Sequence, residues 1–291
     1  MNIQIKNLSK KYGNHHALSQ LNLSIGSGMF GLLGPNGTGK TTLMKILATL
    51  QAPSSGEVRF GELLLGKDDH EIRKVVGYLP QHFGLYERLT GEEFLDYIAI
   101  LKGIRHPVHR KKQIDAVLEE VNLADKRKFK IRTYSGGMRQ RVGIAQALLG
   151  NPQIIITDEP TVGLDPEERI RFRNMLGELS VDRIVLLSTH IVGDIETSCT
   201  ELAIMHAGNV LFQGQPETLL DRMEGKVWTT IVNKQESAEI RSKKNFLSQR
   251  TVQNGYELRV LSDETPIGQA VLASPNLEDA YMALIGGHSI E

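Results

Sequence analysis

A glycine-rich loop is the clearest chemical feature of the sequence. Residues 34–42 read Gly-Pro-Asn-Gly-Thr-Gly-Lys-Thr-Thr, which fits the pattern G-x-x-x-x-G-K-[ST]. Glycines let backbone amides come close to an anion, and consecutive N–H groups form a concavity for phosphate oxygens. Lys40 supplies a compact positive charge for outer phosphates, and the Thr41 hydroxyl can bind Mg²⁺. The candidate nucleotide contacts are Gly34, Pro35, Asn36, Gly37, Thr38, Gly39, Lys40, Thr41 and Thr42.

An acidic pair and a histidine could turn nucleotide binding into hydrolysis. Asp158 and Glu159 follow the apolar run 154–156. Asp158 can reach Mg²⁺ through a water molecule, which leaves Glu159 to polarise a water for in-line attack on the terminal phosphate. His190 follows another apolar strand, so it is expected on the same rim, where ligands of open α/β sheets gather. The alternatives are an Asp-Glu pair that caps a loop and a structural histidine.

Alternating strands and helices are predicted to position these residues. A strand over 29–33 and a helix over 40–50 flank the glycine-rich loop, and the helix directs its positive end at the phosphates. The other expected strands are 3–5, 21–25, 57–60, 75–79, 154–156, 184–187 and 202–205, and a helix is expected over 166–179. The unbroken apolar run Ile154–Ile156 suits a parallel strand covered on both faces. This order of elements predicts an α/β layered domain.

A helical insertion is expected over residues 92–150. One apolar stripe contains Phe94, Tyr97, Ile98 and Leu101, and a second contains Ile114, Val117, Leu118 and Val121. Between residues 102 and 132 the insertion has ten Lys or Arg against four Asp or Glu. We interpret this as a solvated basic face; the alternative is a face near lipid headgroups or an acidic partner.

Composition excludes several classes of protein. The 291 residues include 34 Lys or Arg and 34 Asp or Glu, so no global positive field would hold nucleic acid, and no nucleic-acid partner is expected. The single cysteine excludes an internal disulfide framework and fits a reducing cytosol. The longest apolar run, Ala280–Ile285, is far shorter than the roughly 20 residues of a membrane-spanning helix. Any membrane role must therefore come from a partner chain.

The C-terminal part is expected to be a small α+β appendage. Strands are predicted over 227–232 and 256–261 and a helix over 277–285, while the stretch 233–250 is polar and charged. The predicted organisation is a nucleotide-binding domain over 1–222 and an accessory domain over 223–291.

Several motifs in one order resemble the ATP-binding cassette (ABC) family, the nucleotide-binding subunits of ABC transporters, over residues 2–222. Tyr12 matches the aromatic residue that stacks on adenine, and Gln81 in Tyr-Leu-Pro-Gln matches the glutamine that touches Mg²⁺. Ser135-Gly136-Gly137 matches the signature that separates this family from other phosphate-loop proteins, and Asp165 in Gly-Leu-Asp matches the loop that crosses the dimer interface. His190 matches the switch histidine.

The resemblance implies a fold and a mechanism. The fold would be an α/β cassette with a mixed sheet core and a helical subdomain at about 84–150. Two cassettes, identical or paired, would meet head to tail, with ATP between the phosphate loop of one and the signature of the other. Thr41, Gln81 and Asp158 would hold Mg²⁺, with Glu159 and His190 catalytic. A membrane-spanning permease would bind the cassette on the inner face of the cell membrane, so the chain would be a cytoplasmic, peripheral protein.

Two residues depart from the family's signature. Tyr134 stands where Leu is usual, and Met138 stands where Gln is usual. We expect the signature to function because its serine and both glycines are present. For Met138, the alternative interpretation is a core residue.

The direction of transport and the class of ABC protein rest on weaker features. The helix at 275–284 resembles the closing helix of export-type cassettes, and the short appendage favours export; an ordinary amphipathic helix is the alternative. A soluble ABC ATPase acting on the ribosome or DNA is the main alternative function, but such proteins usually have two cassettes, coiled coils or zinc sites. A small-molecule kinase would leave the signature unexplained, and an inactive binding module also stays open.

Overall fold

The chain forms two compact units in a computed structural model that describes residues 1–242, 245–266 and 270–287. The units are Met1–Val210, which is described in full, and Leu211–Glu291, which is described within those ranges. Their boundary lies earlier in the chain than the functional boundary expected at 222/223, which stays a prediction. Across the described ranges, no helix combines the length and the apolar character needed to cross a membrane.

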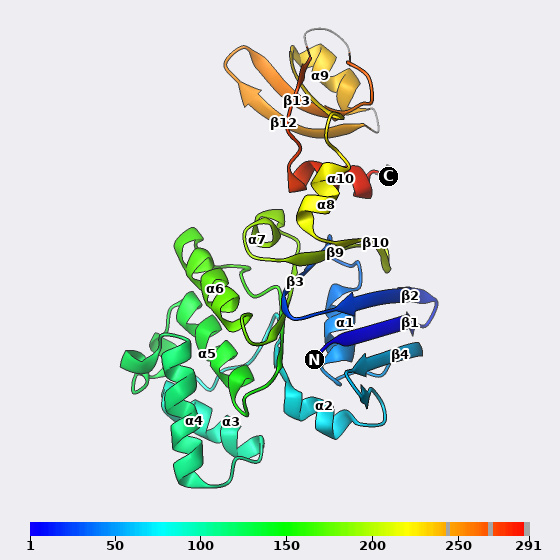
Figure 1. Ribbon diagram of the computed structural model, residues 1–291. Coiled ribbons are helices and arrows are strands. Elements are labelled where there is room, and N and C mark those ends of the chain that lie inside the picture. The colour runs from blue at the N-terminus through cyan, green and yellow to red at the C-terminus, as the bar shows by residue number, and fades with distance from the viewer. Residues whose placement is uncertain (243–244, 267–269, 288–291) are drawn as a thin grey trace. The chain divides into compact units, whose positions relative to one another are not determined.

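A six-stranded sheet has the order β10-β9-β3-β8-β7-β6, and β3, β9 and β10 are labelled in Figure 1. Its strands are β3 (Gly28–Leu33), β6 (Val76–Leu79), β7 (Ile154–Asp158), β8 (Ile184–Thr189), β9 (Glu201–His206) and β10 (Asn209–Gly214). All of these strands except β10, which continues past Val210, lie within the first unit. The pairs β3–β8, β3–β9, β7–β8 and β6–β7 are parallel. Every residue of β7 and β8 is buried, as predicted for parallel strands covered on both faces.

A second, antiparallel sheet has the order β2-β1-β4-β5, with β1 (Ile3–Tyr12), β2 (His15–Ile25), β4 (Ser55–Phe60) and β5 (Leu63–Leu64). Helix α1 (Lys40–Leu47) buries Leu43, Met44, Ile46 and Leu47. These side chains belong to one core cluster with residues of both sheets, including Ile3, Phe60, Phe30 and Ile156. Because the phosphate loop joins β3 to α1, the main core of this unit fixes both ends of the loop.

The helical insertion consists mainly of α3 (Gly91–Leu101), α4 (Pro107–Glu120) and α5 (Gly136–Leu148), which Figure 1 shows gathered away from β1, β2 and β4. The predicted stripe at Ile114, Val117, Leu118 and Val121 is buried. The stripe predicted on α3 is partly wrong: Tyr97 is 41% and Leu101 65% exposed. The buried face of α3 instead contains Phe94, Leu95 and Ala99, and α3 contacts both α4 and α5.

The predicted basic face of the insertion is partly neutralised. Arg127 pairs with Glu92 and Asp115, and Arg110 pairs with Asp96. Lys102 is exposed along part of its side chain, but its Nζ donates to the carbonyl oxygens of residues 147 and 149 at 3.1 and 2.8 Å. Desolvation of its ammonium lowers the pKa of Lys102 to about 8. These three cations stabilise the packing of the helices. Composition alone could not distinguish such paired cations from cations on a solvated face.

The remaining elements of the first unit are α2 (Asp69–Val75), α6 (Pro166–Leu179) and α7 (Val192–Glu196). The predicted helix over 166–179 is confirmed to the residue. Helix α1 ends at Leu47 rather than at the predicted residue 50, since Thr49 adopts a left-handed φ of 58° and Leu50 is 65% exposed. Helix α2 was not expected, and it contains Val75, which was predicted to begin a strand.

The second unit is an α+β fold, as predicted. Its sheet has the order β12-β13-β11-β14, with β11 (Val227–Val232), β12 (Phe246–Val252), β13 (Gly255–Leu261) and β14 (Val271–Leu272). Its helices are α8 (Pro216–Asp221), α9 (Lys234–Arg241) and α10 (Leu277–Ile285), the last confirming the predicted helix over 277–285. The polar stretch 233–250 contains α9 and most of β12. Arg259 on β13 forms an ion pair with the buried Asp279 of α10.

Two glycines of the first unit provide a matched test of how closely α5 packs against β6. A Cβ at Gly77 on β6 would lie 2.4 Å from the carbonyl oxygen of Ala147 on α5, whereas a Cβ at Gly177 on α6 would meet nothing within 4 Å. Gly77→Ala should therefore lower the free energy of unfolding of the first unit by about 1–3 kcal/mol. Gly177→Ala should raise it by about 0.5–1 kcal/mol, since alanine favours a helix. Thermal unfolding would check both, and a stable Gly77→Ala would contradict the close approach of α5 to β6.

Candidate functional site

Two glycines shape the phosphate loop. Gly39 precedes α1 with a left-handed φ of 99°, and a Cβ there would lie 2.4 Å from the carbonyl oxygen of Ala17. A Cβ at Gly34 would lie 2.5 Å from the carbonyl oxygen of Met205. A side chain at either position would clash with backbone of another strand or its connection. The glycines thus let the loop pack closely against the backbone of β2 and β9.

Lys40 lies at the base of the loop and is only 4% exposed. Its Nζ donates to the carbonyl oxygens of Gly34 and Pro35 at 2.6 and 3.1 Å, and it lies 3.5 Å from Glu159 Oε1. Burial lowers the pKa of Lys40, and the carboxylate of Glu159 opposes that shift. The ammonium is therefore surrounded by oxygens where the outer phosphates of a nucleotide would lie.

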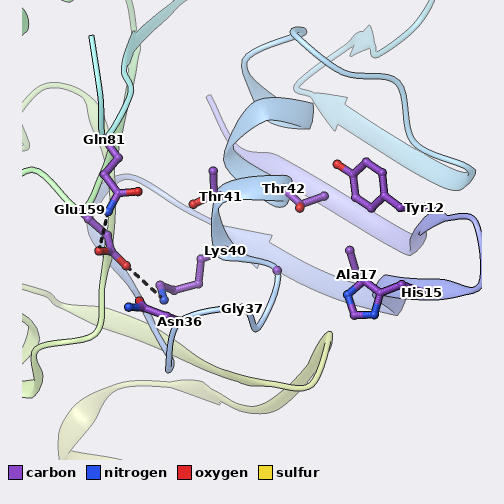
Figure 2. Close-up of a pocket in the computed structure, with 11 residues that line it drawn as sticks. Tyr12, His15, Ala17, Asn36, Gly37, Lys40, Thr41, Thr42, Gln81 and Glu159 are labelled. Atoms are coloured by element: carbon purple, nitrogen blue, oxygen red, sulfur yellow. Dashed lines mark hydrogen bonds and ion pairs between the residues drawn. The ribbon is translucent and has the colours of Figure 1, made fainter.

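A cavity of about 370 Å³ opens beside this lysine (Figure 2). Its lining residues are Tyr12, His15, Ala17, Asn36, Gly37, Gly39, Lys40, Thr41, Thr42, Gln81 and Glu159. Of the other predicted loop contacts, Thr38 is buried and donates to the carbonyl oxygen of Pro35 at 2.9 Å. The volume and the mixture of amides, hydroxyls and charges suit a nucleotide.

His15 is a lining residue that the sequence analysis missed. It faces Tyr12 across the antiparallel pair β1–β2, as direct partners on either side of the Gly13-Asn14 turn. A strand prediction that had extended residues 3–5 and 21–25 to this two-residue turn would have placed the two side chains together. The Tyr12 hydroxyl accepts a hydrogen bond from Gln51 Nε2, and the ammonium of Lys10 lies 5.4 Å from the ring centroid.

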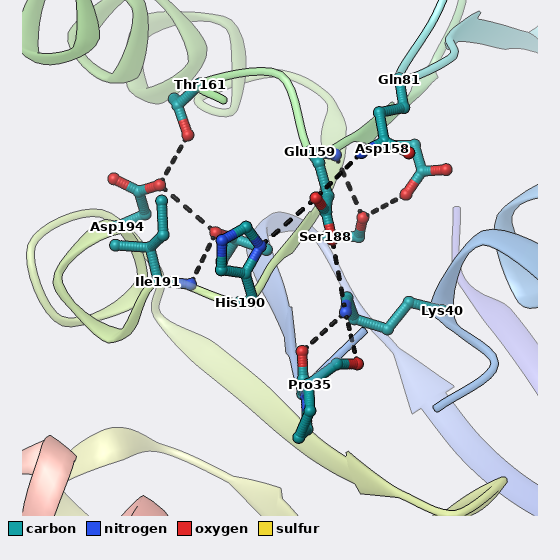
Figure 3. Close-up of polar contacts among 12 residues, drawn as sticks. Pro35, Lys40, Gln81, Asp158, Glu159, Thr161, Ser188, His190, Ile191 and Asp194 are labelled. Atoms are coloured by element: carbon teal, nitrogen blue, oxygen red, sulfur yellow. Dashed lines mark hydrogen bonds and ion pairs between the residues drawn. The ribbon is translucent and has the colours of Figure 1, made fainter. Parts of the chain in front are cut away.

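Glu159 is the residue around which the predicted site residues meet. Its carboxylate is held by Gln81 Nε2 at 3.1 Å and lies 3.3 Å from His190 Nδ1 and 3.5 Å from Lys40 Nζ (Figure 3). Its backbone has a left-handed φ of 48°, which is uncommon for a residue with a side chain. Its amide donates to Ser188 Oγ at 3.2 Å and to the Ser188 carbonyl oxygen at 3.1 Å. Strands β7 and β8 together therefore hold Glu159 in this unusual conformation.

Asp158 is fully buried one residue before Glu159. Its Oδ1 accepts a hydrogen bond from Ser188 Oγ at 2.5 Å, whereas Oδ2 accepts none from any described residue. A buried carboxylate oxygen without a donor is costly unless a cation or a bound water satisfies it. With Thr41 and Gln81 in the adjoining cavity, these oxygen donors fit the hard cation Mg²⁺.

The signature residues lie apart from the first cavity. Ser135 precedes α5 as its N-cap, and its Oγ accepts a hydrogen bond from the Met138 amide at 3.2 Å. A Cβ at Gly137 would clash with the carboxylate of Glu168 on α6. Gly136 and Gly163 line a second cavity of about 460 Å³, together with Gln81, Val162, Leu164 and several neighbours. The structure therefore brings the signature together with the loop before α6, but not with the phosphate loop.

The remaining residues of these motifs have local structural contacts. Asp165 is the N-cap of α6, and its Oδ1 accepts a hydrogen bond from the Glu168 amide at 2.9 Å. Tyr134 is buried, and its hydroxyl donates to the carbonyl oxygen of Lys126 at 2.9 Å. Met138 is half-buried, so it is not a full member of the core. Tyr134 thus fills the usual place of Leu and adds a hydrogen bond.

Comparison with known proteins identifies the family. The ABC transporter family matches residues 18–162. YxlF of Bacillus subtilis, an uncharacterized ABC transporter ATP-binding protein, is 37% identical over 231 residues, which are 79% of this chain and 76% of the relative. The chain belongs to the family of ABC transporter ATP-binding proteins. The family resemblance seen in the motifs is confirmed, and the chain is an ATP-binding subunit with ATPase activity.

Two further relatives have more specific names. The bacitracin transport ATP-binding protein BcrA of Enterococcus faecalis is 31% identical over 99% of this ABC protein and 97% of the relative. The linearmycin resistance ATP-binding protein LnrL of B. subtilis is 34% identical over 77% of this chain and 72% of the relative. BcrA therefore matches the second unit as well as the cassette.

Solved structures support the fold. The dimeric post-hydrolysis structure of the cassette MJ0796, bound to ADP and Pi, is 29% identical with a TM-score of 0.64 over 73% of this chain and 98% of that one. CbiO1 of Clostridium perfringens, part of the transporter complex CbiONQ, gives a TM-score of 0.68 at 25% identity, over 75% of this chain and 90% of that one. The predicted cassette fold is confirmed.

Removal of the buried ammonium tests the nucleotide site. Lys40→Ala should weaken ATP binding by about 100-fold or more, since loss of a buried charged partner costs several kcal/mol. Titration calorimetry or a fluorescent ATP analogue would measure it. The matched control is Lys45→Ala, an exposed lysine of the same helix, which should bind ATP as the wild type does. Unchanged ATP affinity of Lys40→Ala would contradict the assigned phosphate site.

Proposed function

We propose that this chain is the ATP-hydrolysing subunit of an exporter and that it works as a head-to-tail dimer of cassettes. The observation that supports this most directly is the position of Glu159. Its carboxylate lies beside Lys40, Gln81 and His190 at the edge of a nucleotide-sized cavity. An acid in such a place can activate water next to a terminal phosphate.

In the proposed reaction, Glu159 acts as the general base. Its carboxylate accepts a proton from the attacking water as the oxygen approaches the γ-phosphorus in line with the leaving group. Lys40 stabilises negative charge on the outer phosphates, and its ion pair with Glu159 directs the carboxylate towards them. His190 lies on the other side of Glu159, where its ring can donate to the same carboxylate or to the phosphate.

Mg²⁺ is proposed as the cofactor that accompanies ATP. Thr41, Gln81 and the unpaired Oδ2 of Asp158 would hold it, Asp158 through a bound water. When bound, the ion would neutralise negative charge on the phosphate oxygens and so favour attack by water. The ordered Ser188–Asp158 hydrogen bond leaves one carboxylate oxygen directed to that role.

The remaining nucleotide contacts are proposed to divide between two chains. Tyr12 would stack on the adenine at the outer end of the first cavity, and Asn36 and Thr42 would contact the triphosphate. Ser135, Gly136 and Gly137 begin α5, where backbone amides and a hydroxyl can bind phosphate oxygens. Because they lie apart from the phosphate loop, they would serve the nucleotide of a second cassette, with Asp165 at the interface between the chains.

The cellular setting is proposed from the family and the relatives. We assign residues 1–222 to the ATP-binding domain, with a helical subdomain at about 84–150, and residues 223–291 to an accessory domain. A membrane-spanning permease would bind the cassette on the cytoplasmic face of the membrane. Relatives named for bacitracin transport and linearmycin resistance support export as the direction.

The proposed base is tested by Glu159→Gln. This change keeps the shape of the side chain but removes the proton acceptor, so turnover should fall about 100-fold or more while ATP still binds. ATP-dependent dimers should accumulate, which light scattering with Mg-ATP would detect. Glu178→Gln, an exposed acid on α6, is the control. A Glu159→Gln protein that hydrolyses ATP at the wild-type rate would contradict the role as base.

The proposed second half-site is tested by Ser135→Arg. The bulky cation should leave ATP binding by one chain within about twofold of wild type, since Ser135 does not line the first cavity. It should prevent ATP-induced dimers, because the signature could no longer approach a partner's phosphates. Analytical sedimentation of Ser135→Arg in the Glu159→Gln background would measure this, with the exposed Ser55→Arg as control. Dimers that persist would count against the head-to-tail arrangement.

A further inference from the structure

A buried carboxylate outside the proposed catalytic set joins several loops of the first unit. Asp194 on α7 is fully buried. Its Oδ2 accepts hydrogen bonds from Thr161 Oγ1 at 2.7 Å and Thr189 Oγ1 at 3.3 Å. Its Oδ1 lies 3.0 Å from Arg169 Nε and 3.3 Å from Arg173 Nη1, both on α6. One carboxylate thus holds two hydroxyls and two guanidinium groups.

Helix α7 itself is fixed against the central sheet. Ile195, next to Asp194, packs against β3 at Gly31, where a Cβ would lie only 2.3 Å from Ile195 Cδ1. Arg173 Nη1 also donates to the carbonyl oxygen of Gly193 at 2.9 Å. Asp194 is therefore held at a constant position relative to the strands that end at the nucleotide site.

The two threonines are close in sequence to the proposed catalytic residues, and Figure 3 shows Thr161 beside Asp194. Thr161 follows Glu159 by two residues, and Thr189 directly precedes His190. The Thr189 hydroxyl also accepts a hydrogen bond from the Ile191 amide at 3.0 Å, so it spans the turn that contains His190. Asp194 consequently connects the ends of β7 and β8 a second time, on the side away from Lys40.

The arginines extend the connection to the loop that precedes α6. Arg169 and Arg173 lie on the first turns of α6, directly after the segment Gly163–Asp165. Arg169 Nη2 and Arg173 Nε are buried without a hydrogen-bond partner among the described residues. Asp194 is therefore the carboxylate that both guanidinium groups share, and its removal would leave two partly buried cations without this anion.

We propose that Asp194 is a positioning residue that fixes the Glu159 loop, the His190 turn and the start of α6 relative to one another. It would act through Thr161, Thr189 and the two arginines, without touching nucleotide. It would thereby keep Glu159 and His190 at fixed positions relative to the dimer-facing loop, the segment Gly163–Asp165. This inference rests on the proposed roles of Glu159 and His190. It predicts that turnover depends on Asp194, whereas ATP affinity of the single chain does not.

The test compares two isosteric changes of a buried acid in the full-length protein. Asp194→Asn should lower kcat by about 10- to 100-fold, the effect expected when catalytic groups move by a fraction of an ångström to an ångström. The KM and the dissociation constant for ATP should stay within about twofold of wild type. Asp279→Asn, which removes an equally buried partner of Arg259 in the second unit, should lower thermal stability but leave both kcat and KM unchanged.

A milder variant keeps the test decisive if Asp194→Asn folds poorly. Thr161→Val preserves the volume of the side chain but loses the 2.7 Å hydrogen bond to Asp194. It should lower kcat by about threefold to tenfold with unchanged KM. In the Glu159→Gln background, Asp194→Asn should also raise the protein concentration needed for ATP-induced dimers.

The possible outcomes separate this inference from the proposed function. A selective loss of kcat in Asp194→Asn or Thr161→Val supports the positioning role. Wild-type kcat in both variants would overturn it, and so would a parallel loss of ATP affinity and kcat that follows the loss of folded protein. Failure of the proposed function would be detected by a different variant. In that case the Glu159→Gln protein would hydrolyse ATP at the wild-type rate.

Discussion

The structure of the nucleotide site depends on one buried carboxylate, Glu159, held against one buried ammonium, Lys40. Glu159 is 5% and Lys40 4% exposed, so their attraction acts in a medium of low dielectric. The left-handed backbone of Glu159 is stabilised by two hydrogen bonds to Ser188 on the neighbouring strand. Strain of this kind persists only where surrounding structure determines it, and here β7, β8 and the phosphate loop do so together. Movement of any of these three would displace the carboxylate.

The pair of Lys40 and Glu159 links phosphate binding to the proposed hydrolysis, because one hydrophobic core supports both residues. Helix α1 is packed between two sheets, so the loop before it cannot move without disturbing the largest cluster of buried side chains. The same sheet directs Asp158 and Glu159 to its carboxyl edge, beside the loop. Asp194 adds a connection from the opposite side, through Thr161 and Thr189. Phosphate binding, the proposed water activation and the dimer-facing loop thus share one rigid frame.

The difference between predicted and observed structure follows from the range of the interactions involved. The phosphate loop, helix 166–179 and strand 154–156 were predictable because glycine conformation, an N-terminal proline and an apolar run are local signals. The buried stripe of α3 was not, since the sequence offers Tyr97 and Leu101 as equal apolar candidates. Only packing against α4 and α5 decided that both face outward.

The sequence by itself determined the residue types of the site, because the chemistry of phosphate binding requires certain glycines, a lysine and carboxylates at short spacings. Tertiary structure decided which of them meet. It placed Glu159 against Lys40, Gln81 and His190, left Ser135 apart from them, and put His15 beside Tyr12. Such contacts join residues distant in the chain, so their geometry depends on strand register and helix packing, which local spacing does not contain.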